Sequence, residues 1–180
     1  GRVWRGRRLA RSGGADGANR HHHAGTFTVP AHPSQVVCID YFTAIFLVEL
    51  GLTPAGGIDY SWVDDASMYP AYVPILTKLP NIGEITSTNY EKITALRPDL
   101  ILGPTPGSRY DNSQGAMKTL SALAPVALVD FGRTGDWRGP FEQAARLVGR
   151  EEQLKPLVAE YQKAVATTRP RTPICWLPRW

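Results

Sequence analysis

The segment that most constrains the fold of this chain is Ile82–Gly103, with the sequence IGEITSTNYEKITALRPDLILG. Its middle part predicts a helix that begins after Thr88 or Asn89, because either side chain can accept a hydrogen bond from a free N–H group of the first turn. Pro98 cannot continue a helix, and it pushes the preceding residue, Arg97, out of the α region. The segment therefore predicts a turn, a capped helix and a sharp exit, in that order.

A short apolar strand follows this helix. Leu100, Ile101 and Leu102 form an uninterrupted apolar run, which Gly103 and Pro104 are expected to stop. Such a run is typical of a strand in a parallel sheet whose two faces are both covered by helices. We therefore expect a strand that is buried on both sides.

Strands and helices alternate along the rest of the chain. Besides the run just described, strands are predicted at residues 35–40, 53–58 and 125–129. Helices are predicted at residues 43–50, 88–96, 116–123, 141–148 and 151–168, with a short helical or irregular segment at 72–79. Thr43 is the expected cap of the first helix, and the glycines at 56 and 57 allow close backbone approach. This alternation predicts an α/β fold, in which a mainly parallel sheet of about four or five strands is flanked by helices.

The two ends of the chain differ in composition from the rest. Residues 1–26 are rich in Gly, Arg and His and have no hydrophobic period, so we expect a disordered tail. Residues 27–150 carry the alternating pattern, residues 151–168 the long helix, and residues 169–180, with three prolines, an irregular tail. The net charge of +4 comes from the ends, which carry +5 in residues 1–20 and +3 in the last twelve, against −4 between them. Because the body is mildly acidic, no nucleic-acid partner is expected.

Several function classes lack the residues that they need. His21, His22 and His23 are adjacent, and adjacent side chains rarely converge on one metal ion, so no metal site is expected. Cys38 lies in an apolar strand pattern, as a small buried hydrophobe does, and Cys175 lies in the tail. The chain has no G-x-G-x-x-G after its first strand, no P-loop and no G-x-S-x-G, so an enzyme is not expected. No segment approaches the roughly 18 apolar residues of a membrane span.

The carboxyl ends of the predicted strands are followed by loops that hold much of the aromatic and arginine content. In open α/β sheets, ligands bind outside these strand ends. The loops expected there are residues 41–42, 59–70, 105–114 and 131–139. Trp62, Tyr110 and Trp137 would all lie at this one edge.

Five segments in a fixed order resemble one known family. They are QVVCID, ELGLTPAGGID, IGEITSTNYEKITALRPDLILG, LSALAPVALVD and FEQAARLVGRE, and a long helix follows them. Together they resemble the N-terminal lobe of the substrate-binding proteins of iron–siderophore ABC importers, the class III periplasmic-binding-protein-like proteins. The nearest resemblance is to the hydroxamate-siderophore binders of Gram-positive bacteria. It covers residues 26–168 and is most specific in NYEKITALRPDLIL, beside Ile82 and Gly83.

The resemblance implies two α/β lobes joined by one long helix, with the ligand held between them. Residues 27–150 would be the first lobe and residues 151–168 the linker helix, while the second lobe is absent. The implied partners are a ferric hydroxamate siderophore, such as a ferrioxamine, and the permease subunits of an ABC importer. The implied location is extracytoplasmic and membrane-associated through a lipid anchor, although no intact signal peptide or lipobox is visible.

The implied ligand needs aromatic faces and N–H donors rather than metal ligands. A ferric hydroxamate already fills the coordination sphere of its iron, so we expect no metal ligand from the protein and no cofactor of its own. Aromatic side chains would face the apolar shell of the ligand, and arginine would donate to its partly negative oxygens. The residues assigned to this site are Trp62, Tyr90, Tyr110 and Trp137 as walls, Arg109 and Arg133 as donors, and Tyr60 and Tyr41 as further candidates.

Two surface carboxylates are candidates for docking. The resemblance implies that each lobe presents a carboxylate to permease arginines, and Glu91 or Glu84 would serve here. Glu91 has a second interpretation, because negative charge at a helix N-terminus contributes typically about 0.3–1 kcal/mol to the helix itself.

Two alternative functions stay open. A relative that binds Zn or Mn directly would need several His, Asp or Glu side chains at strand ends, where the ordered part offers only His32. The other alternative is a fragment that cannot retain ligand. A single lobe lacks the contacts of the second lobe, while the cost of immobilising the ligand is unchanged.

Overall fold

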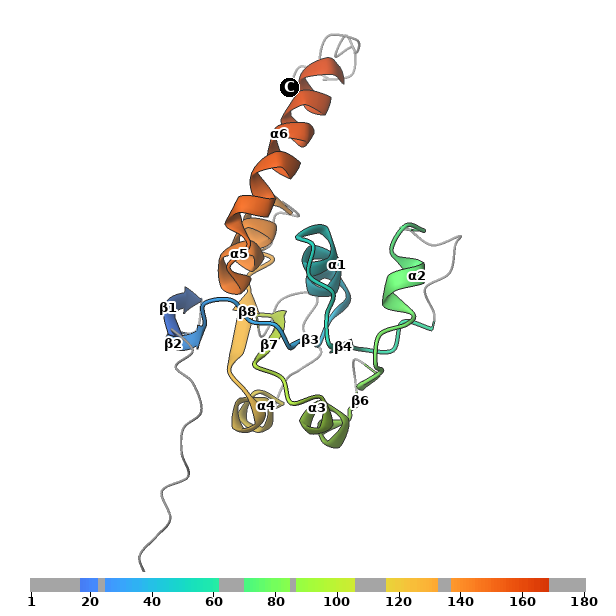
Figure 1. The fold of residues 1–180 in the computed structure, drawn as a ribbon, viewed down its shortest axis with the longest axis vertical. Helices are drawn as coiled ribbons and strands as arrows, with labels where there is room; N and C mark the ends of the chain where they lie inside the picture. The colour runs from blue at the N-terminus through green and yellow to red at the C-terminus, as the bar shows by residue number, and fades with distance from the viewer. Residues whose placement is uncertain are drawn as a thin grey trace, which may run out of the picture.

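The computed structural model of the chain describes residues 17–22, 25–61, 70–84, 87–105, 116–132 and 137–168 (Figure 1). The strands are β1 Gly17–His22, β2 Gly25–Pro30, β3 Val36–Cys38, β4 Gly56–Gly57, β5 Gly83–Glu84, β6 Ser87–Thr88, β7 Leu100–Pro104 and β8 Val126–Val129. The helices are α1 Tyr41–Glu49, α2 Val73–Leu76, α3 Tyr90–Leu96, α4 Met117–Leu123, α5 Arg138–Val148 and α6 Glu151–Thr168.

Within the described residues, four strands form the central sheet. Their order is β4–β3–β7–β8, and every neighbouring pair is parallel. Val37 aligns with Gly56 on one side and with Ile101 on the other, and Ile101 in turn aligns with Val126. This arrangement confirms the predicted α/β fold with a parallel sheet.

Alternate residues of the strands face two helical layers. Cys38 faces the larger core cluster, to which α1 and α5 contribute. Val37 and Ile101 face the other cluster, together with Ile93 of α3 and Leu120 of α4. Figure 1 shows α1 and α5 on one side of the sheet and α3 and α4 on the other. Both faces are therefore covered, as the apolar strand run predicted.

Residues 82–96 fold largely as their sequence predicts. Gly83, with a φ of 104°, lies in the small β5–β6 hairpin, and a positive φ of this size favours glycine. Asn89 caps α3, because its side-chain oxygen accepts a hydrogen bond from the backbone N–H of Lys92 at 3.0 Å. Arg97 ends the helix in the left-handed region, with φ 49° and ψ 56°. The predicted cap and the predicted exit from the α region are both confirmed.

β7 continues farther than the sequence predicts. It pairs with β8 through Pro104. The N–H groups of Ile101 and Thr105 donate to carbonyl oxygens on the β8 side at 2.8 and 2.9 Å, so the nitrogen of Pro104 faces the other way. On that side the pairing with β3 ends at Leu102. The expectation that Gly103 and Pro104 stop the strand is therefore wrong, because no ladder hydrogen bond is lost at the proline.

Two helices begin earlier than the sequence predicts. α1 begins at Tyr41 and is capped by Asp40, so the expected cap at Thr43 is wrong. The backbone N–H groups of Phe42 and Thr43, in the first turn, donate hydrogen bonds to the Asp40 carboxylate, so the helix can start earlier. α5 begins at Arg138 instead of residue 141. The expected loop at residues 41–42 is therefore the first turn of α1.

The expectation of disorder through residue 26 is wrong for residues 17–22 and 25–26. These residues belong to β1 and β2, which form an antiparallel hairpin, and β1 lies against β8 (Figure 1). The two strands pair with each other, and contact with β8 attaches the hairpin to the lobe, which the sequence alone does not show. Val29 of β2 is fully buried in the larger core cluster. Residues 1–16 lie outside the described part of the chain, as does the predicted irregular tail at 169–180.

The long helix α6 has the bounds that the sequence predicts. Figure 1 shows it extending away from the rest of the lobe. Pro156 lies in its second turn without ending it. Leu154 packs against the larger core cluster, whereas Tyr161, farther along, is 54% exposed. The base of the helix is thus anchored in the lobe.

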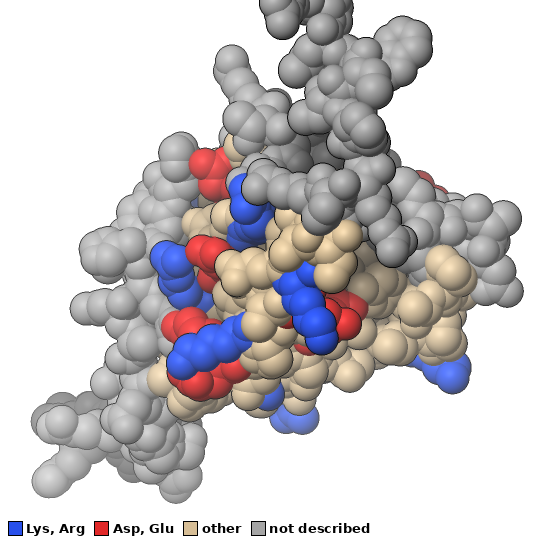
Figure 2. All heavy atoms as spheres, turned by 90° about the horizontal axis from the view of Figure 1, so that it is seen from above, with Lys and Arg blue, Asp and Glu red and all other residues tan. Residues whose placement is uncertain are grey.

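Charged side chains of both signs are interspersed over α5 and α6. Arg146 pairs with Glu142 at 3.3 Å, and Lys155 pairs with Glu152 at 2.6 Å. Figure 2 shows acidic and basic side chains mixed on the described part of this face. Exposed pairs of this kind contribute about 0.2–1 kcal/mol each. They stabilise the helices weakly and do not form a surface of one sign.

Candidate functional site

The carboxyl ends of β3, β4 and β8 lie at one edge of the sheet, because these strands run parallel. The chain leaves them at Ile39, Ile58 and Asp130. α1 begins directly after β3, and α5 begins after the segment that follows β8. Ligands of open α/β sheets bind outside this edge. We therefore take it as the candidate ligand-binding edge.

Among the described residues, five aromatic side chains gather at this edge. We call Tyr41, Phe42, Tyr60, Phe131 and Trp137 the edge aromatic cluster. The ring centroids of Phe42 and Trp137 are 4.5 Å apart, and those of Phe131 and Trp137 are 5.7 Å apart at an interplanar angle of 71°. Tyr41 lies 5.4 Å from Phe42 and 6.0 Å from Tyr60. These contacts join α1, the start of α5 and the ends of β4 and β8 into one aromatic surface.

The edge aromatic cluster rests on further rings in the core. Phe46 of α1 stacks on Phe131 with centroids 5.8 Å apart, and it lies 5.1 Å from Phe141 of α5. Aromatic pairs of this geometry contribute about 0.5–1.5 kcal/mol beyond their buried area. The cluster is therefore held in place from below by packing.

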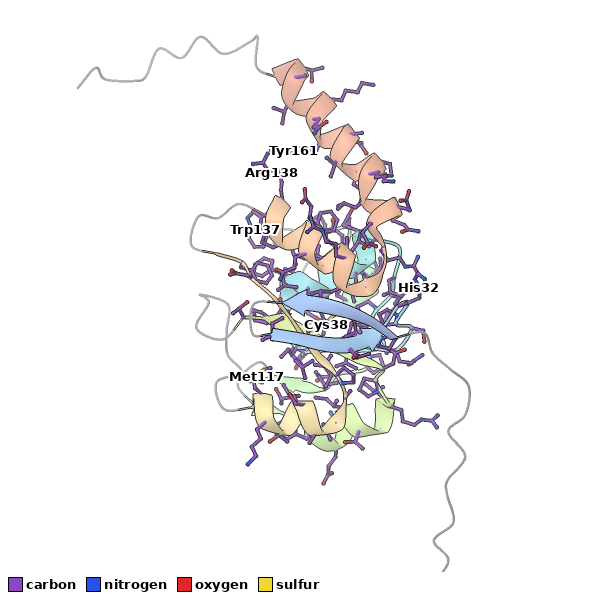
Figure 3. The ribbon with its side chains drawn as sticks, turned by 90° about the vertical axis from the view of Figure 1, so that its left-hand side faces the viewer. His32, Cys38, Met117, Trp137, Arg138 and Tyr161 are labelled. Carbon is purple, nitrogen blue, oxygen red and sulfur yellow. The ribbon has the colours of Figure 1, made fainter. Side chains whose placement is uncertain are left out.

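Exposure differs within the cluster. Trp137 is 38% exposed, and Figure 3 shows it at the start of α5 beside Arg138. Tyr41 and Tyr60, which the sequence offered as further ligand contacts, are 7% and 3% exposed. In this structure Trp137 presents an accessible ring, while the two tyrosines form the inner part of the same wall.

Of the other predicted site residues, Tyr90 lies in the described part of the chain. Tyr90 is the first residue of α3, where it packs partly buried against the core cluster on the opposite face of the sheet from Trp137. α3 leads into the amino end of β7, which puts its own N-terminus, with Tyr90, near the carboxyl edge. Four predicted residues lie outside the described part of the chain and stay predictions: Trp62, Arg109, Tyr110 and Arg133.

The glycines of β4 make room for Tyr60. A Cβ atom on Gly57 would lie 2.7 Å from the phenol oxygen of Tyr60, and one on Gly56 would lie 2.5 Å from a side-chain carbon of Leu96. A Cβ atom on Gly56 would also lie 3.1 Å from the backbone carbonyl oxygen of Pro80, so the expected close backbone approach is confirmed at Gly56. In this position the Tyr60 hydroxyl donates to the backbone carbonyl of Asp40 at 3.3 Å.

Asp40 is a residue of this edge that the sequence analysis did not single out. Its side chain is buried, and Oδ1 accepts hydrogen bonds from the backbone N–H groups of Phe42 at 2.8 Å and Thr43 at 3.0 Å. The Thr43 hydroxyl donates to Oδ2. Burial raises the pKa of the carboxyl to about 6, although these hydrogen bonds lower it. An Asp directly after a buried strand and before an apolar helix is the signal that could have found it.

Two neighbours of Asp40 are buried titratable groups. Burial, with a further contribution from the charge of Asp40, raises the pKa of the Cys38 thiol well above its ordinary value. Burial also raises the pKa of the Tyr60 phenol, followed by the charges of Cys38 and Asp40. Both groups are therefore neutral near pH 7, and Cys38 behaves as a small core side chain rather than a nucleophile.

The two candidate docking carboxylates are both on the surface. Glu91 lies in the first turn of α3, and Glu84 lies in β5. Both side chains are exposed, so each is accessible to a partner protein.

A hollow of about 550 Å³ lies at the opposite, amino edge of the sheet. It is lined by His32, Pro33, Ser34, Leu52, Gly149, Arg150, Glu152 and Gln153. Figure 3 shows His32 at the far end of the molecule from Trp137, so the hollow is separate from the edge aromatic cluster. No group of three His, Cys, Asp or Glu residues in the described ranges is placed to hold a metal ion.

The family of this chain follows from a direct comparison. A family model described as periplasmic binding protein matches residues 36–174. The chain belongs to the periplasmic binding protein family. The matched region contains the whole parallel sheet and the edge aromatic cluster.

Known periplasmic binding proteins resemble this one at low identity. The probable siderophore-binding lipoprotein YfiY of Bacillus subtilis is 28% identical over 146 residues, which are 81% of this chain and 42% of YfiY. The Fe(3+)-citrate-binding protein YfmC of the same organism is 27% identical over 155 residues, 85% of this chain and 47% of YfmC. The triscatecholate siderophore binding protein FeuA of Bacillus subtilis, solved with ferri-bacillibactin, superposes with a TM-score of 0.67 at 19% identity, over 87% of this chain and 52% of FeuA.

The chain spans about half the length of the relatives that it matches. All three are named for binding and none for catalysis, as the sequence analysis expects of a periplasmic binding protein. In the described part of the chain, no helix combines the length and apolarity needed to cross a membrane.

Proposed function

We propose that this chain is the ligand-binding lobe of an extracytoplasmic substrate-binding protein that serves an ABC importer of ferric siderophores. The observation that carries the proposal is the edge aromatic cluster, which lies at the carboxyl ends of the parallel strands, where open α/β sheets generally bind ligands. Trp137 presents a ring that is 38% exposed, on a base of packed aromatic side chains. Aromatic rings bury large apolar area on rigid side chains, which suits the organic shell of an iron chelate.

Within this class we propose a ferric hydroxamate of the ferrioxamine type. Trp137 and Phe42 would contact its apolar shell, with Trp62, Tyr90 and Tyr110 as further walls. Arg109 and Arg133 would donate to the hydroxamate oxygens, because a guanidinium offers several N–H donors and stays charged. The names of YfmC and FeuA make ferric citrate and a ferric triscatecholate the complexes to compare.

The remaining parts of the proposal concern the whole transporter. Residues 27–150 would form the ligand-binding lobe, and residues 151–168 the helix that links it to a second lobe. Glu91 or Glu84 would face arginines of the permease subunits. The protein would be held outside the cytoplasm, at the membrane, by a lipid anchor, as the lipoprotein name of YfiY suggests.

A fluorescence titration tests the proposal. The chain contains five tryptophans, so the signal of Trp137 is obtained as the difference between the native protein and the Trp137→Phe variant. Each protein is titrated with ferrioxamine, ferric citrate, a ferric triscatecholate, and with free Zn²⁺ and Mn²⁺. Equilibrium dialysis of the same complexes measures binding independently of quenching by their absorbance.

The proposal predicts saturable binding of a ferric complex and quenching of the Trp137 signal. Saturation by ferrioxamine at the lowest concentration supports the hydroxamate assignment, whereas preference for citrate or catecholate replaces it with that ligand class. A response to free Zn²⁺ or Mn²⁺ alone would overturn the siderophore proposal. Dialysis that detects no ferric complex at millimolar concentration would show that the lobe alone does not retain ligand.

A further inference from the structure

We propose that Asp40 is a positioning residue of the ligand wall, which fixes the first turn of α1 and thereby sets Tyr41 and Phe42 against Tyr60 and Trp137. The inference deepens the proposed function and rests on it. Asp40 itself is 4% exposed, so it acts through these rings and does not contact ligand.

The hydrogen bonds of Asp40 reach the residues that build the wall. Its carboxylate accepts from the N–H groups of Phe42 and Thr43, at 2.8 and 3.0 Å, and from the Thr43 hydroxyl. These bonds fix the backbone at the start of α1, from which Tyr41 and Phe42 project. Phe42 then lies 4.5 Å from Trp137, centroid to centroid. A shift of the first turn would therefore move the ring on which Trp137 rests.

The backbone of Asp40 ties in a second strand end. Its carbonyl oxygen accepts the Tyr60 hydroxyl at 3.3 Å, and the Tyr60 ring lies 6.0 Å from Tyr41. Asp40, at the end of β3, thus holds the start of α1 through its side chain and the segment after β4 through its main chain. Both segments contribute rings to the edge aromatic cluster.

Capping a helix with a buried carboxylate costs free energy, because the charged group loses its hydration. Ser, Thr or Asn would accept the same backbone hydrogen bonds without burying a charge. This cost raises the pKa of Asp40 to about 6, because burial disfavours the charged form. Titratable groups with such shifts cluster at functional sites. A charged acceptor also holds its donors more tightly than a neutral one, which is what positioning of the first turn requires.

Among the described residues, three titratable groups lie around Asp40. They are Cys38 on β3, Tyr41 on α1 and Tyr60 after β4. Burial raises the pKa of both Cys38 and Tyr60 well above their ordinary values. Of these described groups, Asp40 is the one whose raised pKa, about 6, lies between pH 5 and 7.5.

Protonation of Asp40 has opposite effects on stability and on binding. The neutral carboxyl no longer carries the cost of a buried charge, so acid stabilises the fold. It is also a weaker acceptor for the Phe42 and Thr43 N–H groups, so the first turn loosens and the wall loses its fixed shape. A residue with a merely structural role would move stability and binding in the same direction.

The test compares Asp40→Asn with the native chain between pH 5 and 7.5. We expect the affinity of the native protein for its ferric complex to fall by about fivefold at pH 5, because hydrogen bonds to a neutral acceptor are roughly half as strong as those to a charged one. Asp40→Asn is expected to bind with that lower affinity at both pH values. In urea it is expected to be at least as stable as the native protein at pH 7.5.

Asp99→Asn is the matched control. Asp99 accepts backbone N–H groups of Ser34 at 2.8 Å and Gln35 at 3.0 Å in the same manner, but at the amino edge of the sheet. The Asp99→Asn variant is expected to bind the ferric complex with the native affinity, and this affinity is expected to depend on pH as in the native protein. Because all proteins bind the same complex, effects of pH on the ligand are common to them and cancel.

The outcomes separate this inference from the proposed function. If the native protein binds and Asp40→Asn keeps native affinity and pH dependence, the inference is wrong and the proposed function stands. If no ferric complex binds, near-UV circular dichroism of the ligand-free protein decides. A change in the aromatic signal near pH 6 that is absent in Asp40→Asn supports positioning, and a signal that does not change with pH overturns it.

Discussion

The buried carboxyl group of Asp40 links folding of this lobe to pH. Its pKa is raised from 3.8 to about 6 in the folded protein, so the folded state binds this proton more tightly than the unfolded chain. The stability that it contributes is therefore fully present below pH 3.8 and is lost as the pH rises through about 6. We expect the contribution of this group to the free energy of unfolding to be about 1.4 kcal/mol lower at pH 7.5 than at pH 5.

Substitution of Asp40 and of its partner tests this linkage. Asp40→Asn is expected to remove the difference, as measured by urea unfolding at the two pH values. Thr43→Val is expected to shift the loss of stability to higher pH, because it removes the hydroxyl hydrogen bond that lowers the pKa of Asp40 and keeps the backbone one. Equal pH dependence in all three proteins would mean that Asp40 does not titrate in this range.

Trp137 is the residue on which the proposed ligand contact most depends. Trp137→Ala removes the accessible ring of the edge aromatic cluster and its contact with Phe42, so we expect at least a tenfold loss of affinity, of the order seen for a buried aromatic anchor. Tyr161→Ala is the matched control, because it removes another exposed aromatic ring, on α6. Dialysis with the ferric complex should show native binding for this control, and equal losses in both variants would argue against the edge as the site.

At the level of elements, the C-terminal end of α3 allows a direct test of the backbone conformation at Arg97. Arg97 has a φ of 49°, a left-handed conformation that costs a non-glycine residue about 1–2 kcal/mol. Arg97→Gly is therefore expected to raise the free energy of unfolding by about 1 kcal/mol, because glycine adopts this conformation without strain. Arg97→Ala, which keeps the strain, serves as the control. If urea unfolding shows no difference between the two variants, Arg97 does not retain this conformation in solution.

The elements that could be predicted from sequence are those with local causes. Asn89, Arg97 and Pro98 fix the cap and the end of α3 through interactions within a few residues, so the predicted helix is confirmed. The predicted start of α1 is too late, because the sequence pattern places Asp40 at the end of the preceding strand and Thr43, which can also cap a helix, at the cap position. The continuation of β7 through Pro104 depends on where β3 ends, which is a property of the neighbouring strand.

The candidate site was less predictable than the fold. Its place at the carboxyl edge followed from the strand–helix order, and Trp137 lies there as expected. The burial of Tyr41 and Tyr60 could not be seen in the sequence, because it depends on the early start of α1 and on the space left by Gly57. The role proposed for Asp40 depends on contacts between three separate segments.

At the scale of the whole molecule, the sheet separates two edges with different properties. One edge carries the edge aromatic cluster, and the other carries the hollow lined by His32 and Arg150. α6 extends from the lobe beyond α5 (Figure 1). The proposed function depends on which edge meets the ligand.

The most direct measurement of this central claim is a map of ligand contact by NMR. A gallium complex of the siderophore is diamagnetic, so backbone and indole N–H resonances can be followed as it is added to the native protein. We predict shifts concentrated at Tyr41, Phe42, Tyr60 and the indole of Trp137. Shifts confined to the amino edge around His32 and Arg150, or a response to free metal alone, would contradict the assignment of this edge as a siderophore-binding site.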